Sequence, residues 1–256
     1  MQTINTIPTG FGYVLQGAKI LLTPGLKRYV LVPLLANVAV FLVLTIALIH
    51  SFTDISQWLE GMLTDWWSWL AVAAWIIAWV FSIVIFLLVL VVYGYSFNLI
   101  TNFIAAPFYG LLAEKIEQHL TGAITPAESF SHMLLRTFGR ELVKLWYFIS
   151  RGLLVAIGLF VLSFIPPFNL LVPVLAFLWS TWVITLQYVD YPADNHQLSF
   201  KELRQRVTRQ RYSSIGHGGT VMVGSMIPVI NILVMPIAVA SGTLFWIKEL
   251  EGVKSS

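Results

Sequence analysis

The chain has 256 residues, of which 58% are hydrophobic and 11% are charged, and its formal net charge is +3. Soluble domains carry about 25% charged residues, so this composition predicts an integral membrane protein. The absence of cysteine excludes disulfides, thiolate metal sites and cysteine nucleophiles. The basic residues flank apolar runs, which fits the positive-inside rule better than binding to nucleic acid.

The N-terminal part of the chain predicts two full membrane spans. Residues 1–28 are mixed in polarity and predict a short interfacial helix, and they show no signal-peptide cleavage pattern, so we expect them to remain in the mature protein. Residues 29–50 follow without a charge and are long enough to cross a hydrocarbon core of about 30 Å. The apolar run at residues 69–97 is longer still and predicts the second span.

The charges between and after these runs predict the orientation in the membrane. Residues 51–68 hold three acidic residues, several tryptophans and no Lys or Arg, so we expect this loop on the outer side. Beyond the first span, the Lys and Arg residues all follow residue 97. The N-terminus and the basic regions are therefore predicted to be cytoplasmic.

Residues 98–150 predict two amphipathic helices, one at about 108–120 and one at about 131–150. The second helix carries four cations within about 80° of one another, which predicts a continuous basic stripe. Such a stripe could draw anions along it or rest on acidic lipid, and the sequence favours neither. The four cations are Arg136, Arg140, Lys144 and Arg151.

The polar residues further on predict a loop and a short helix. Residues 190–196 predict the loop, and residues 200–211 predict a basic helix. The loop contains two acidic residues and a histidine, but their spacing matches no metal site, so a structural turn around Pro192 is expected. The glycines within residues 216–219 are expected to open the last hairpin.

Two proline-containing breaks interrupt the apolar C-terminal half. The first, at residues 165–173, leaves apolar runs of about 13 and about 16 residues on its two sides, each too short to cross a bilayer alone. The second, at residues 227–236, repeats the pattern Ile-Pro-x-x-Asn. These breaks predict re-entrant hairpins at about 152–189 and 219–247 that enter and leave the membrane on one side.

Asparagines in the apolar segments are candidates for the wall of a polar path. Asn169 and Asn231 lie in the two breaks. The alternative is that each proline only ends a helix between two packed arms. Asn37, Asn98 and Asn102 lie near the ends of the full spans. They could line the same path or hydrogen-bond across helices, because an unpaired amide is costly in lipid.

Three charged residues complete the set of path-lining candidates. Glu114 is the acidic residue nearest to this region, and Arg136 and Arg140 are its candidate cationic partners. Glu114 could act as a gate or carry a proton. A salt bridge between Glu114 and one of the arginines, holding the helix in place, is the expected arrangement.

These elements predict an all-α membrane protein with two long transmembrane helices, two re-entrant (half-membrane) helical hairpins and amphipathic cytoplasmic helices. Residues 1–256 are expected to form a single integral membrane domain. Four stretches carry a further signal in this order: residues 25–28 with 33–37, residues 102–114, residues 187–196 and residues 227–236. Together they resemble the CysZ family of bacterial sulfate permeases across residues 25–236.

The resemblance implies both a fold and a function. The implied fold has two long spans and two re-entrant helical pairs, assembled into dimers or larger oligomers in the bacterial inner membrane. The implied function is entry of sulfate for cysteine biosynthesis, with the anion bound by a short Gly-Leu-Arg-type motif and without a cofactor. Here that motif reads Gly25, Leu26, Lys27 and Arg28, so a lysine replaces one bidentate arginine.

The residues themselves leave two classes of function open. The first is an oxyanion channel or transporter, and the second is a membrane scaffold whose hairpins wedge one leaflet. An enzyme is not expected, because no nucleophile with a nearby base and no metal triad is evident. No ATP-binding loop occurs, which favours a passive or weakly gated path, with a proton-coupled symporter as the alternative. The choice among sulfate, sulfite and thiosulfate stays open.

Overall fold

The structure, a computed structural model, describes residues 5–23, 25–63, 71–122 and 128–252. Every element of regular structure in these ranges is helical, which confirms the predicted all-α class. The chain divides into two compact units, of which one is Leu34–Ala105 and the other is the rest of the chain.

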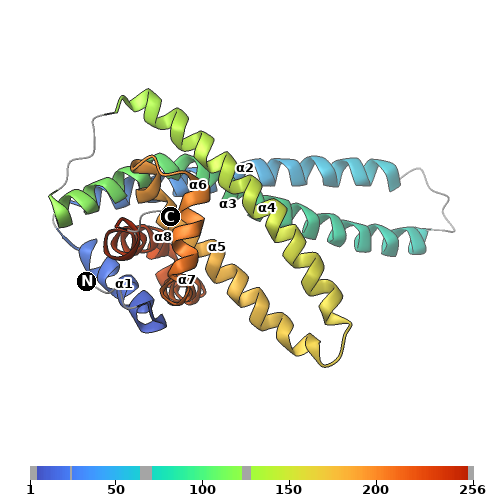
Figure 1. The fold of residues 1–256 in the computed structure, drawn as a ribbon. Coiled ribbons are helices and arrows are strands. Elements are labelled where there is room, and N and C mark those ends of the chain that lie inside the picture. The colour runs from blue at the N-terminus through green and yellow to red at the C-terminus, as the bar shows by residue number, and fades with distance from the viewer. Residues whose placement is uncertain (1–4, 24, 64–70, 123–127, 253–256) are drawn as a thin grey trace. The chain divides into compact units, whose positions relative to one another are not determined.

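Figure 1 shows the helices in chain order. Residues 108–120 and 131–150 are helical as predicted, but they are the last turns of one long helix and the first turns of another. The elements are α1 (Ile7–Ile20), α2 (Lys27–Leu63), α3 (Ala71–Thr121), α4 (Phe130–Ser163), the 3₁₀ segment η2 (Phe168–Leu171), α5 (Val172–Asn195), α6 (Phe200–Arg209), α7 (Arg211–Ser225), α8 (Pro228–Phe245) and the π-helical segment η3 (Trp246–Leu250).

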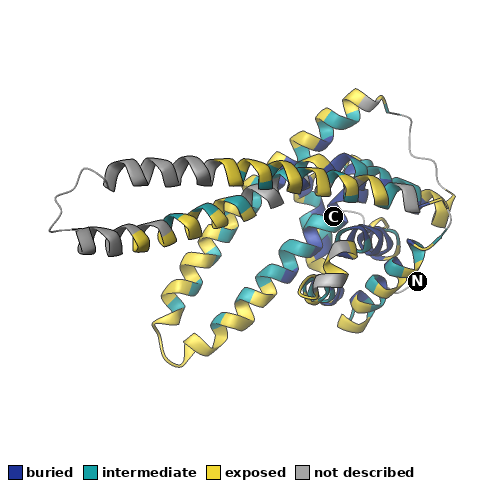
Figure 2. Ribbon diagram, turned by 180° about the vertical axis from the view of Figure 1, so that it is seen from behind, coloured by how far each residue is buried: buried dark blue, intermediate teal, exposed yellow. Residues whose placement is uncertain are grey.

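The unit Leu34–Ala105 pairs α2 with α3. The Tyr93 hydroxyl lies 2.8 Å from Oγ1 of Thr45, and the Tyr93 ring meets the edge of Phe41 at 6.5 Å between centroids. Most other described side chains of this pair are apolar and exposed (Figure 2). A helix pair with so much exposed apolar surface suits lipid rather than water. The spans predicted at residues 29–50 and 69–97 are helical wherever they are described.

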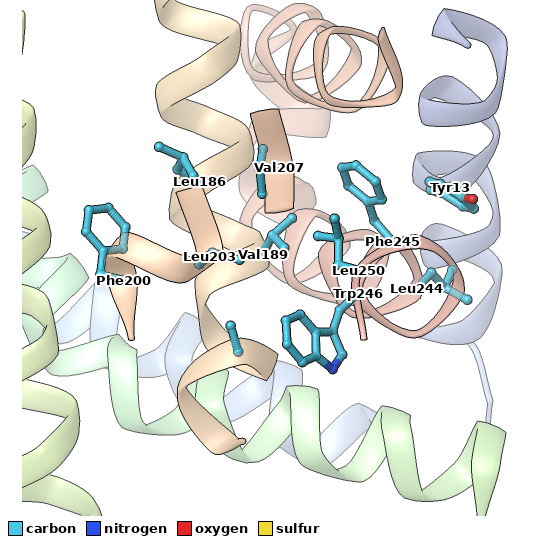
Figure 3. Packing of buried hydrophobic residues seen from close by; sticks show 11 residues of the cluster. Tyr13, Leu186, Val189, Phe200, Leu203, Val207, Leu244, Phe245, Trp246 and Leu250 are labelled. Carbon is cyan, nitrogen blue, oxygen red and sulfur yellow. The ribbon is translucent and has the colours of Figure 1, made fainter. Parts of the chain in front are cut away.

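The second unit has a packed core. The helices α1 and α5 both pack against α7 and α8. Figure 3 shows the resulting cluster, in which side chains of α1, α5, α6, α8 and η3 meet. Tyr13 stacks on Phe245 at 5.6 Å between centroids, and Leu186 and Leu203 are fully buried. This core positions the polar residues described below.

Glycines bring α7 close to its neighbours. A Cβ on Gly216 would lie 2.9 Å from the carbonyl carbon of Ile7 in α1, and a Cβ on Gly218 would lie 2.8 Å from that of Thr181 in α5. The glycines predicted to open the last hairpin lie inside α7 instead. At Gly216 and Gly218 the neighbouring backbone leaves no room for a Cβ, so only glycine allows these approaches. His217 between them is fully buried.

The first predicted break is present. The helix α4 ends at Ser163 and α5 begins at Val172. However, α4 has 34 residues and α5 has 24, because both continue through polar segments beyond the apolar runs. By length and composition, four described segments could each cross a membrane, and they are Tyr29–His50, Ser131–Ser163, Phe168–Asn195 and Leu233–Leu250. The predicted division into full and re-entrant passes stays a prediction.

The second break is shorter than predicted. The helix α7 ends at Ser225 and α8 begins at Pro228, so the chain is broken only at Met226 and Ile227. Proline is favoured in the first turn of a helix, where its missing N–H needs no partner. The helix then continues through Pro236, which was expected to end the break.

The predicted loop at residues 190–196 is wrong, because α5 continues through Pro192 to Asn195. The helix ends just after it, where Gln197 has a φ of 55° and the N–H of Leu198 donates to the carbonyl of Ala193 at 3.0 Å. This is a left-handed helix cap. The acidic residues of this segment are therefore held on a rigid helix.

Candidate anion site and charge network

The segment that resembles an anion-binding motif connects α1 to α2. Gly25 has a φ of 97°, in the left-handed region that glycine adopts without steric cost. Leu26 is only 5% exposed, and its N–H donates to the carbonyl of Thr23 at 3.3 Å. A glycine-dependent turn anchored by a buried leucine therefore leads the chain into α2.

The start of α2 has the backbone features of an anion site. The helix begins at Lys27, so Lys27 and Arg28 lie in its first turn, where N–H groups lack helical partners and the dipole is positive. A Cβ built on Gly25 meets no atom of the described residues within 4 Å, so these residues leave the space beside it open. The side chains of Lys27 and Arg28 lie outside the described part of the chain, and their contacts with an anion stay predictions.

The structure describes two of the five asparagine side chains predicted to line a path. Asn169 in η2 and Asn231 in the first turn of α8 are both exposed. Their N–H groups donate to the carbonyls of Ile165 at 3.1 Å and Ile227 at 2.8 Å, so they lie at matching places after the two breaks. The side chains outside the described part are those of Asn37, Asn98 and Asn102.

Carboxylates neutralise most of the basic stripe on α4. Arg136 lies 3.0 Å from a carboxylate oxygen of Glu128 and 2.5 Å from one of Asp194. The hydrogen bonds from Arg136 hold the pKa of Glu128 below its usual range. Arg140 donates to Oδ1 of Asp190 from Nε at 2.9 Å and from Nη2 at 2.6 Å. The stripe is therefore not an open basic surface at these positions.

Lys144 is the most deeply buried cation of the stripe. Its Nζ lies 2.5 Å from Oε1 of Glu141 and 3.3 Å from Oδ2 of Asp190. The ammonium also lies 4.7 Å from the centre of the Tyr191 ring. With Arg140 on the other side of Asp190, two cations and two carboxylates balance one another, as burial requires.

The acidic members of this network were missing from the residues predicted to form a site. Asp190 and Asp194 are four residues apart, and so are their partners Arg140 and Arg136. Residues four apart share one face of a helix, so these spacings match when α4 and α5 lie antiparallel. This matched spacing was the available signal, but it is only visible once residues 190–196 are taken as helical.

Glu114 does not join the network. Its carboxylate lies 3.3 Å from Nζ of Lys115, whereas Arg136 and Arg140 are paired with Glu128, Asp194 and Asp190. The predicted salt bridge between Glu114 and an arginine of α4 is therefore wrong. The arginines instead join α4 to α5.

Three other side chains come close enough to share a metal ion. Nε2 of His196 lies 2.7 Å from Oε1 of Glu117, and the ligand atoms of these two residues and Glu251 all lie within 4.8 Å of one another. The hydrogen bond to Glu117 raises the pKa of His196, because it favours the protonated imidazole. A protonated His196 binds Glu117 without a metal, so an ion pair explains the contact.

Comparison with known proteins places the chain in a family. Three relatives, each named sulfate transporter CysZ, align over almost its whole length. The Pseudomonas fluorescens protein is 40% identical over 245 residues, which are 94% of each chain. The Vibrio parahaemolyticus protein is 37% identical over 258 residues, 98% of this chain and 99% of its own. The Vibrio atlanticus protein is 38% identical over 257 residues, 97% of this chain and 96% of its own.

A family model matches the chain as well, over residues 13–236. That range includes the four stretches that carry the sequence resemblance, from Gly25 to Pro236. The chain therefore belongs to the family described as Sulfate transporter CysZ/Etoposide-induced protein 2.4.

Proposed function

We propose that this chain carries sulfate, or a related oxyanion, across a bacterial inner membrane and so supplies cysteine biosynthesis. The observation that carries the proposal is the alignment over nearly the full chain with relatives named sulfate transporter CysZ. The turn at Gly25 supports it, because an open helix N-terminus beside Lys27 and Arg28 offers the N–H donors and positive charge that a dianion needs.

Within this proposal, residues 25–28 form the binding segment. Gly25 allows the backbone to approach the anion, and the buried Leu26 fixes the turn. Lys27 and Arg28 supply positive charge, with the lysine acting as a point charge and the arginine as a fork. The asparagines of the spans and of the hairpin connections then offer amide donors along the path.

The proposed membrane arrangement has full spans at residues 29–50 and 69–97 and re-entrant hairpins at 152–189 and 219–247, with the N-terminus cytoplasmic. The connection between α4 and α5 supports the first hairpin, because its apolar side chains are exposed. The side chain of Leu170, for example, is 74% exposed. An exposed apolar connection fits lipid better than water. The helix α7 supports the second hairpin, since its 15 residues reach only about 22 Å of a core about 30 Å thick.

The proposed mechanism is a passive or weakly gated path. Moving a dianion inward against about 100 mV costs roughly 4.6 kcal/mol, so net flow has to be drawn by consumption of sulfate inside the cell. The buried carboxylates of Glu141, Asp190 and Asp194 are each matched by a cation. This network is charge-balanced and is not a chain of free acids that could pass a proton.

Uptake of radiolabelled sulfate into proteoliposomes tests the proposal. We expect uptake without an imposed proton gradient, and at least about tenfold weaker sulfate binding by calorimetry for Lys27→Ala combined with Arg28→Ala. The control is Lys19→Ala, which removes an exposed cation of α1 and should leave binding unchanged.

Each contrary result has a distinct meaning. Uptake only with a proton gradient would replace the passive path by a symporter. Folded protein without any uptake would favour a membrane scaffold. Unchanged affinity in the folded double variant would remove residues 25–28 from the site while leaving transport itself in place.

A further inference from the structure

A cavity of about 470 Å³ lies between α4 and the start of α6. Arg140 and Arg151 of α4 and Lys201 and Arg204 of α6 line it, and the described lining residues include no acidic side chain. Asp190 balances Arg140 from the buried side. The other three cations, one on α4 and two on α6, have no acidic partner among the described residues that line the cavity.

Aromatic rings orient Arg204 in this cavity. Its guanidinium carbon lies 4.4 Å from the centre of the Tyr147 ring and 5.5 Å from that of Phe200. A guanidinium stacked on a ring keeps its N–H groups free in its own plane. Nε of Arg204 is buried and has no hydrogen-bond partner among the described residues. An unsatisfied buried donor is costly, and the described residues leave this one without an acceptor.

The N-terminus of α6 adds to the positive field. Ser199 caps this helix, because its Oγ accepts the N–H of Glu202 at 3.2 Å. Ser199 and Lys201 both line the cavity, so the positive end of the helix dipole faces it. Three cations and a helix N-terminus around one cavity suit a phosphate or sulfate group.

The surroundings of the cavity distinguish a lipid from a free anion. Trp146 lines the cavity and is 74% exposed, and α4 carries further exposed apolar residues on either side of it, including Leu142, Ile149 and Leu153. Figure 2 shows this exposed surface continuing along α4. Trp and Tyr side chains gather at the level of lipid headgroups. An occupant with apolar chains would cover this surface, whereas a free dianion would leave it bare.

We propose that this cavity binds the phosphate of an anionic phospholipid headgroup, whose acyl chains lie along the exposed apolar face of α4. Basic pockets beside membrane helices on the cytoplasmic side bind anionic headgroups in this way. Arg151, Lys201 and Arg204 contact the phosphate, and Trp146 lies at the boundary between headgroup and chains. The proposal does not depend on transport of sulfate.

The test compares lipid retention in matched charge variants. Full-length protein is placed in nanodiscs of equal phosphatidylglycerol and phosphatidylcholine, and retained lipid is measured by native mass spectrometry. Arg151→Gln with Lys201→Gln removes two exposed cations of the cavity. Lys19→Gln with Arg211→Gln removes two exposed cations that do not line it. We expect the cavity variant to retain roughly tenfold less phosphatidylglycerol than wild type, and the control to match wild type.

Two further measurements keep the result decisive. Thermal unfolding in detergent checks that each variant folds, and Arg151→Gln alone replaces the double variant if that does not fold. Calorimetric titration with sodium sulfate is expected to give equal affinities for the cavity variant and the control. Equal phosphatidylglycerol retention by the two variants would overturn the proposal, as would a cavity variant that loses sulfate affinity but keeps its lipid.

Discussion

Lys144 can stay charged at 1% exposure only because two carboxylates lie beside it. Glu141 depends on Lys144 as its cationic partner, whereas Asp190 is also held by the fork of Arg140. Removing one member of a buried pair leaves an uncompensated charge, which costs more than the pair contributes. The network therefore constrains α4 and α5 to one register, whatever anion passes through the protein.

We expect Lys144→Met to destabilise the protein by about 3–5 kcal/mol, because Glu141 is then buried without a partner. Adding Glu141→Leu should recover at least half of that loss, since both charges are gone and Asp190 keeps Arg140. Thermal unfolding in detergent, followed by tryptophan fluorescence, measures both. A double variant as unstable as the single one would show that packing of the lysine stem, rather than its charge, is what matters.

At the scale of the helix, the backbone of α7 lies very close to the backbones of α1 and α5. Its two adjacent glycines Gly218 and Gly219 both face α5 but differ in what they meet. A Cβ at Gly218 would lie 2.6 Å from Oγ1 of Thr185 and 2.8 Å from the carbonyl carbon of Thr181, and closer still to the carbonyl oxygen of Thr181. A Cβ at Gly219 would be 3.4 Å from the ring of Phe177. At Gly218 the neighbour is the backbone of α5, which cannot move away locally. At Gly219 the neighbour is the side chain of Phe177, which can move.

We therefore expect Gly218→Ala to destabilise the protein by about 3 kcal/mol or more, because α7 would have to separate from α5. Gly219→Ala should change the stability little, since 3.4 Å is an ordinary contact and alanine favours the helix. Melting temperatures of the two variants in the same detergent give the comparison. Similar values for both would show that α7 and α5 are not in close backbone contact.

Local signals predicted the elements well where the determining residues are near in sequence. Prolines and a short apolar run were enough to predict the break after Ser163, and the uncharged run from Tyr29 to His50 was enough to predict a helix. The segment 190–196 was predicted wrongly, because its charges resemble a loop until their partners on α4 are known. The motif at residues 25–28 was recognisable locally. The ion-pair network was not, since the pairs that join α4 to α5 are about 50 residues apart along the chain.

For the molecule as a whole, the exposed apolar surface bears on how many times the chain crosses the bilayer. The helices α4 and α5 are long enough to cross, but their connection is apolar and exposed, which favours a hairpin that ends inside the membrane. In the re-entrant arrangement Asn169 lies within the bilayer. If both helices cross, Asn169 reaches the outer side instead.

A single cysteine at this position separates the two arrangements, because the chain contains no other. We expect Asn169→Cys to resist a membrane-impermeant maleimide added to the outside of cells, since the proposed hairpin keeps it below the outer surface. Ser68→Cys, in the loop predicted to lie outside, should react from outside. Gln205→Cys, exposed on the basic helix α6, should react only in inverted vesicles. Outside labelling of Asn169→Cys at the rate of Ser68→Cys would show that α4 and α5 both cross, and the chain would then have two more full spans than the sequence predicts.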